Sequence, residues 1–131
     1  MRITEKWIKK DIIDPPFSIE ECSLFLGDVG GVNDTEKILN NIIDIINIKK
    51  TETVELYCIK SSSSSFKFYI LTGNFKVESQ GNGMNIGYDG GGPKRFARFL
   101  SNLFDIDKEK ILSDLKENLS DNYSLYFKFS D

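Results

Sequence analysis

Residues 54–71 read VELYCIK-SSSSS-FKFYIL and contain two runs in which hydrophobic residues recur at every second position. This alternation is typical of β-strands with one buried face. Five serines separate the runs, and a polar stretch between two strands is most simply a hairpin loop. The segment therefore predicts two antiparallel strands, over residues 54–59 and 66–71, joined by a serine loop.

Further strands are predicted towards the C-terminus. Residues 72–74 form a turn or bulge ahead of Phe75 and Val77, and the glycines of residues 81–83 mark a turn ahead of a short strand over 84–88. Residues 123–129 alternate again, with Phe127 and Phe129 on the apolar side. A pattern this strong so near the terminus indicates a strand paired within the sheet.

Three segments have the hydrophobic spacing of an amphipathic helix. The first covers residues 34–48 and is rich in isoleucine, which indicates burial against a sheet. The second begins at Pro93, because proline suits the first helical position, and continues to residue 104. The third follows Asp107, whose side chain can cap it, and continues to Leu119.

The N-terminal region leaves two alternatives open. Residues 1–14 fit a short strand or a helix equally well, and Pro15-Pro16 ends either one. Ser18 and Glu21 form a capping-box pattern that predicts a short helix to about Leu26, but residues 22–26 also alternate as a strand does. With 131 residues, the chain is long enough for one domain. We predict a single α+β domain over residues 1–131, with an antiparallel or mixed sheet of about five strands and helices mainly on one face.

Composition excludes several classes of function. The 17 basic and 20 acidic residues give a net charge of −3, which argues against nucleic-acid and membrane partners. There is no histidine, so the commonest general base and metal ligand is missing. Cys22 and Cys58 are too few for a disulfide framework and are expected to be small buried residues. No signal peptide is visible, so we expect a cytoplasmic, non-enzymatic protein without metal or cofactor.

One segment looks suited to binding. Tyr88 and Asp89 precede three glycines, Gly90, Gly91 and Gly92, at the start of the second predicted helix. The free N–H groups of a helix start, together with the charges of Lys94, Arg95 and Arg98, could hold a phosphate or a carboxylate. The segment departs from the Walker pattern, because Pro93 follows the last glycine. A sharp structural turn, a protein-binding surface and a small-anion site remain open here.

Other groups of residues give weaker indications of a functional site. Residues 105–109 alternate like the start of a calcium loop, but Lys110 stands where that loop requires glycine, so helix capping is preferred. Two of Asp28, Asp34 and Asp89 could meet in three dimensions as a carboxylate pair, which leaves an enzyme that uses carboxylates alone as a further alternative. Tyr57, Tyr69 and Tyr126 are expected to share the more exposed sheet face, opposite the core. Tyrosine gives large rigid contact area, so such a face would suit protein binding.

The run Tyr88-Asp89-Gly90-Gly91-Gly92-Pro93, followed by a helix ending in Phe99-Leu100, resembles a Y-x-G-x-G-P turn found in small bacterial proteins. The short, acidic α+β chain also resembles the immunity proteins encoded beside bacterial secreted toxins. That resemblance implies a non-enzymatic inhibitor that binds one toxin and blocks its active site. Immunity families share folds without sharing binding residues, so no contact residue is implied.

Two functional hypotheses follow. The first is a protein-binding inhibitor of immunity type, which neutralises a cognate bacterial toxin by stoichiometric binding. The alternative is a protein that binds a nucleotide or phosphate at residues 87–98.

Overall fold

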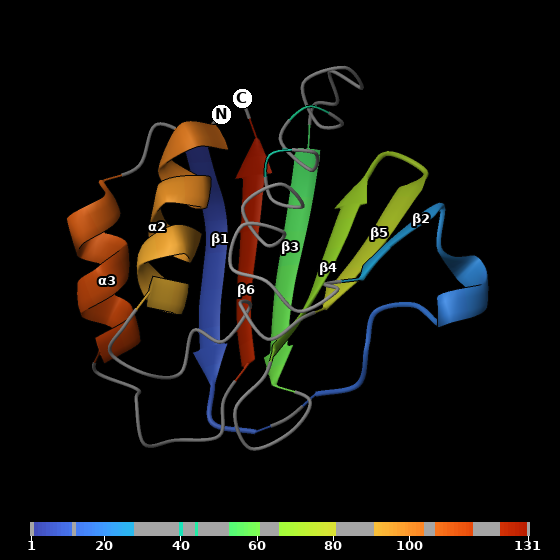
Figure 1. Ribbon diagram of the computed structural model, residues 1–131, viewed down its shortest axis with the longest axis horizontal. Helices are drawn as coiled ribbons and strands as arrows, with labels where there is room; N and C mark the ends of the chain where they lie inside the picture. The colour runs from blue at the N-terminus through green and yellow to red at the C-terminus, as the bar shows by residue number, and fades with distance from the viewer. Residues whose placement is uncertain are drawn as a thin grey trace.

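The computed structural model describes residues 2–11, 13–27, 40, 44, 53–60, 66–80, 91–103, 107–116 and 124–130 (Figure 1). Its centre is a six-stranded sheet with the strand order β1-β6-β3-β4-β5-β2. All neighbouring strands are antiparallel except β2 and β5, which are parallel, so the sheet is mixed. The strands are β1 (Arg2–Lys9), β2 (Leu24–Gly27), β3 (Thr53–Lys60), β4 (Phe66–Thr72), β5 (Phe75–Gln80) and β6 (Ser124–Ser130).

The strands predicted over residues 54–59, 66–71 and 123–129, and the run at Phe75 and Val77, are confirmed in the described residues as β3, β4, β6 and β5. β3 and β4 pair as predicted, and β4 continues into β5 through Gly73-Asn74, a two-residue turn in which Gly73 has a φ of 61°. Glycine suits this position because a Cβ atom disfavours the left-handed conformation. β6 lies between β1 and β3, so the last strand of the chain is an interior strand of the sheet.

The N-terminal alternatives resolve into short elements. Residues 2–9 form a strand, β1, at one edge of the sheet. Ser18 and Glu21 do form the capping box, but the helix η1 is a single 3₁₀ turn over Ile19–Glu21. The alternating residues that follow form the short strand β2 at the other edge. Both readings of this region are therefore partly right. With β1 and β2, which the sequence had left open, the described sheet has six strands, against about five expected.

The described residues include the full span of two α-helices, α2 (Gly91–Leu103) and α3 (Lys108–Lys116). α2 begins two residues before the expected position, so Gly91 and Gly92 lie in its first turn and Pro93 is its third residue. Proline is tolerated there because first-turn N–H groups have no partner within the helix. Asp107 caps α3 as predicted, since its Oδ1 accepts a hydrogen bond from the Glu109 backbone N–H at 3.0 Å.

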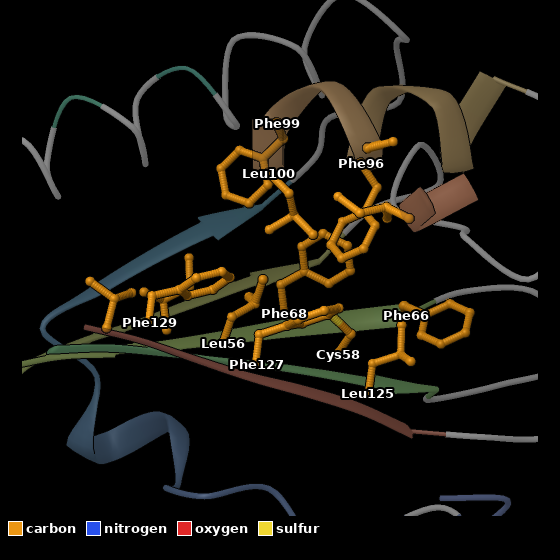
Figure 2. Packing of buried hydrophobic residues seen from close by; sticks show 14 of the residues in the cluster. Leu56, Cys58, Phe66, Phe68, Phe96, Phe99, Leu100, Leu125, Phe127 and Phe129 are labelled. Carbon is orange, nitrogen blue, oxygen red and sulfur yellow. The ribbon is translucent and has the colours of Figure 1, made fainter. Parts of the chain in front are cut away.

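The hydrophobic core lies between the sheet and these helices (Figure 2). Phe96 of α2 contacts Phe68 and Phe127 of the sheet edge-on or tilted, at ring-centroid distances of 5.3 and 6.3 Å. The sheet contributes every second residue of its strands, as the alternation predicted, and the helices their apolar stripes. The buried cluster comprises Val54, Leu56, Cys58, Phe66, Phe68, Ile70, Val77, Phe96, Ala97, Phe99, Leu100, Ile111, Leu115, Leu125, Phe127 and Phe129.

The described elements thus form one small α+β domain with α2 and α3 on one face of a mixed sheet (Figures 1 and 2). None of the described helices is long and apolar enough to cross a membrane. Several predictions lie outside the described residues: the serine loop, the strand over 84–88, and Asp28, Asp34 and Asp89. Of the helix predicted over 34–48, only Asn40 and Asp44 are described, both helical and exposed.

Candidate functional site

A row of aromatic residues crosses the sheet on the face opposite α2 and α3, which we call the back face. Residues paired directly across antiparallel strands point to the same face of a sheet. Trp7 is paired with Tyr126, Tyr126 with Tyr57, and Tyr57 with Tyr69. These four residues, here called the aromatic row, therefore come from four adjacent strands and share one face.

Three rings of the aromatic row, those of Trp7, Tyr126 and Tyr57, contact one another. Trp7 and Tyr126 stack with centroids 5.1 Å apart and planes 19° apart. Tyr57 lies 4.7 Å from Tyr126, tilted by 54°, and 6.4 Å from Trp7, edge-on. Aromatic pairs at these separations are favourable beyond their buried area. The row is therefore a pre-formed surface, because its rings already support one another.

The segment between β1 and β2 covers one half of the back face. Phe17 packs edge-on against Tyr69, with ring centroids 5.3 Å apart, and both side chains are buried. Lys76 of β5 holds this segment in place: its Nζ lies 3.3 Å from Glu21 Oε2 and 6.0 Å from the centre of the Phe17 ring. Ser23 also exchanges hydrogen bonds with the backbone of Lys76.

The other half, which we call the open half, contains Trp7, Tyr126 and Tyr57. Trp7 and Tyr57 are half-buried and keep accessible surface, whereas Tyr126 between them is only 4% exposed. Lys9 places its Nζ 4.6 Å from the centre of the Trp7 ring. The expectation that three tyrosines share one face is right, but two of them, Tyr69 and Tyr126, are buried rather than exposed.

Two tyrosine–glutamate pairs fix the hydroxyl groups of the row. The Tyr126 hydroxyl donates a hydrogen bond of 2.6 Å to Glu55 Oε1, and Tyr69 is hydrogen-bonded to Glu78. Burial, followed by these carboxylates, raises the pKa of both tyrosines, and burial with nearby Glu55 and Glu5 raises the pKa of Tyr57. The hydroxyl groups therefore stay protonated at neutral pH and can donate hydrogen bonds, while none is poised as a base.

The predicted anion-binding segment is described in part. Tyr88, Asp89 and Gly90 lie outside the described residues, while Gly91 and Gly92 open α2. The next turn of α2 carries the three cations: Lys94 and Arg98 are exposed and Arg95 is half-buried. Arg95 Nε is shielded from solvent and has no hydrogen-bond partner among the described residues. That N–H group is the feature of this segment that an acceptor would satisfy.

The thiols differ in environment. Cys58 is buried in the core as expected, but Cys22, in the segment between β1 and β2, is only partly buried and packs against the cluster of Phe17, Ile59 and Tyr69. Burial raises the pKa of both thiols, so neither is activated as a nucleophile.

Sequence reasoning did not single out Trp7 or Glu55. Their importance depends on the pairing of β1 with β6 and of β6 with β3, which joins distant parts of the chain. The local signal was present, because Glu5, Trp7 and Lys9 alternate with the residues of β1 on the helix-covered face. The strand assignment of residues 2–9 was the missing step.

Comparison with known proteins adds no relative: no protein-family model matches the chain, and no match was found among curated proteins or among solved structures.

Proposed function

We propose that this protein is a non-enzymatic inhibitor that binds another protein through the open half of its back face, most simply an immunity protein that neutralises a cognate bacterial toxin. The single observation that carries the proposal is the aromatic row, in which Trp7 and Tyr57 keep accessible surface over a buried Tyr126. Trp and Tyr dominate the binding energy of protein interfaces when they are rigid and centrally placed.

The chemistry of the face favours binding over catalysis. Its tyrosine hydroxyls have raised pKa values and act as hydrogen-bond donors, and its cysteine neighbour Cys22 also has a raised pKa. A rigid row loses little conformational entropy when a partner covers it. An inhibitor needs this property, because it must hold a toxin tightly without changing it chemically.

The experiment is a stoichiometric binding assay with each toxin encoded beside the gene, followed by native mass spectrometry. We expect a one-to-one complex with an interface of roughly 1,600 Å². Trp7→Ala and Tyr57→Ala should each weaken the complex by about 30-fold, the effect of losing a hot-spot residue of about 2 kcal/mol. Asn102→Ala, at an exposed position of α2, is the matched control and should leave affinity unchanged. Wild-type affinity in both aromatic variants argues against this face as the interface.

A second candidate function rests on Arg95. Its Nε is shielded and unpaired among the described residues, in the second turn of a helix that starts with two glycines. A nucleotide or inorganic phosphate bound at residues 87–98 would supply an acceptor for that N–H group and meet the exposed cations Lys94 and Arg98. The test is thermal stabilisation of the protein by phosphate, ADP and ATP. Arg95→Glu should abolish the stabilisation while leaving the melting temperature of the free protein nearly unchanged.

A further inference from the structure

The two edge strands of the sheet differ in their protection against pairing with a further strand. An edge strand presents unpaired N–H and C=O groups, and charged side chains or a β-bulge on it disfavour further pairing. β1 has both devices, because four of its eight residues are charged and its register on β6 shifts between Ile3 and Glu5. Its Lys6 is also bound to Asp114 of α3, so the helix layer reaches this edge.

β2, at the other edge, has neither device. Its sequence is Leu-Phe-Leu-Gly, without charge or proline, and it pairs with β5 over all four residues with no shift of register. In the described part of the sheet, β5 is its sole neighbour. Figure 1 shows β2 at the side of the sheet away from α2 and α3, so neither of these helices covers its outer side.

Exposed hydrophobic side chains accompany this edge. Phe25 of β2 is 39% exposed, and Ile19 of η1, six residues earlier, is 58% exposed. Phe25 is paired with Glu78 and Glu78 with Tyr69, so Phe25 lies on the back face. An exposed phenylalanine alone is ordinary, but one within an uncharged edge strand favours a strand partner that would cover it.

We propose that β2 pairs with β2 of a second copy of this chain, antiparallel about a two-fold axis at Phe25. This register sets Phe25 opposite Phe25 and Leu24 opposite Leu26. Residues 22–27 carry no charge, so the self-paired strands bring no like charges together, and aromatic pairs across strands are favourable. A two-fold contact of this kind closes on itself, so the assembly stops at a dimer.

The inference goes beyond the proposed function and leaves the proposed interface free. Trp7 lies in β1, at the opposite edge of the sheet, and β4 and β5 separate Tyr57 of β3 from β2. A dimer joined at β2 therefore presents two open halves, and the ratio of toxin to chain stays one to one.

Sedimentation velocity of the free protein over a concentration series tests the dimer. We expect a monomer–dimer equilibrium with a dissociation constant on the order of 10 µM, in keeping with a small interface. Phe25→Lys removes the ring and places two like charges opposite each other, so it should weaken dimerisation by at least about 30-fold. Asn102→Lys adds the same charge at an exposed position of α2 and should leave the equilibrium unchanged.

Cross-linking tests the register. Opposed Cα atoms of an antiparallel pair lie about 4.5–5.5 Å apart, a separation that a disulfide can span. In a Cys22→Ser background, where Cys58 is buried, mild oxidation of Phe25→Cys should give a covalent dimer, and Asn102→Cys should stay monomeric. Circular dichroism checks that each variant keeps its fold.

Three results would overturn the inference: a monomer at every concentration, a dimer that Phe25→Lys does not weaken, or a dimer that Phe25→Cys does not cross-link. Toxin binding is measured separately, so any of these results leaves the proposed function intact.

Discussion

The Tyr126 hydroxyl donates a 2.6 Å hydrogen bond to Glu55 Oε1, across the neighbouring strands β6 and β3. The bond positions a buried aromatic ring between Trp7 and Tyr57, so it links the packing of the sheet to the geometry of the open half. Five predictions test this account of the fold and the site.

The first concerns the bond itself. Glu55→Ala leaves the buried Tyr126 hydroxyl without its acceptor, and we expect the free energy of unfolding to fall by about 1–3 kcal/mol. Glu55→Gln retains an acceptor and should cost less than half as much. Urea titration followed by Trp7 fluorescence gives both values. Equal losses in the two variants would show that the charge, not the hydrogen bond, provides the stability.

The second concerns alkaline pH. The pKa values of Tyr57, Tyr69 and Tyr126 lie above their ordinary value of 10.0, and those of Cys22 and Cys58 lie above 9.0. The folded chain therefore holds more protons than the unfolded chain above about pH 9, so the free energy of unfolding falls as pH rises. Below pH 8 these tyrosines and cysteines are protonated in both states, so their contribution to the free energy of unfolding should not change with pH. Tyr126→Phe removes one titrating group and should make the decline shallower, as denaturation at pH 8 to 11 would measure.

Removing a buried polar group should stabilise the protein. Ser79 of β5 is fully buried, and its Oγ has no hydrogen-bond partner in the part of the chain that the structure describes. Ser79→Ala removes an unsatisfied hydroxyl with little change in volume, and we expect a gain of about 1 kcal/mol or more. Ser101→Ala is the control, because that hydroxyl donates to the Arg98 carbonyl at 3.1 Å and its loss gives no gain. A destabilised Ser79→Ala variant would show that the hydroxyl has a partner.

The β4–β5 turn provides a backbone test. Gly73 has a φ of 61°, where a Cβ atom costs roughly 1–2 kcal/mol. Gly73→Ala should therefore lower the free energy of unfolding by that amount without changing the binding surface. The exposed Asn102→Ala variant should stay within about 0.5 kcal/mol of wild type. The prediction fails if thermal denaturation finds the two variants equally stable.

The contact between β1 and α3 can be measured in a double-mutant cycle. Lys6 forms an ion pair with Asp114 and lies 5.9 Å from the centre of the Phe127 ring. Both side chains are about 30% exposed, so we expect a coupling energy of about 0.2–1 kcal/mol. Lys6→Ala alone should cost more than Asp114→Ala, because it also loses the contact with Phe127. If the effects of the two single substitutions are additive, the coupling energy is zero and the ion pair does not stabilise the fold.

The sequence predicted what local periodicity determines. Alternation identified β3, β4 and β6, and helical spacing identified α2 and α3, because a half-buried element repeats its apolar side chains locally. Strand parity also correctly put Tyr57, Tyr69 and Tyr126 on one face.

The site was harder to predict because it depends on pairing between distant strands. Trp7 reaches the row only through the register of β1 on β6, which connects the two ends of the chain. Tyr69 is buried because Phe17 folds back over it, and nothing in the alternation of β4 indicates that cover. The two edge strands were left open for a related reason: residues 1–14 fit a strand or a helix equally well, and β2 is only four residues long, too short for its pattern to exclude a helix.

The most direct test of the central claim measures how accessible Trp7 is in the free protein and in its complex. Acrylamide quenches tryptophan fluorescence by collision, and the only tryptophan of the chain lies in the open half of the back face. We predict that quenching of Trp7 drops several-fold when a tryptophan-free or tryptophan-substituted cognate toxin binds stoichiometrically. A stable one-to-one complex in which Trp7 remains as accessible as in the free protein would contradict the account.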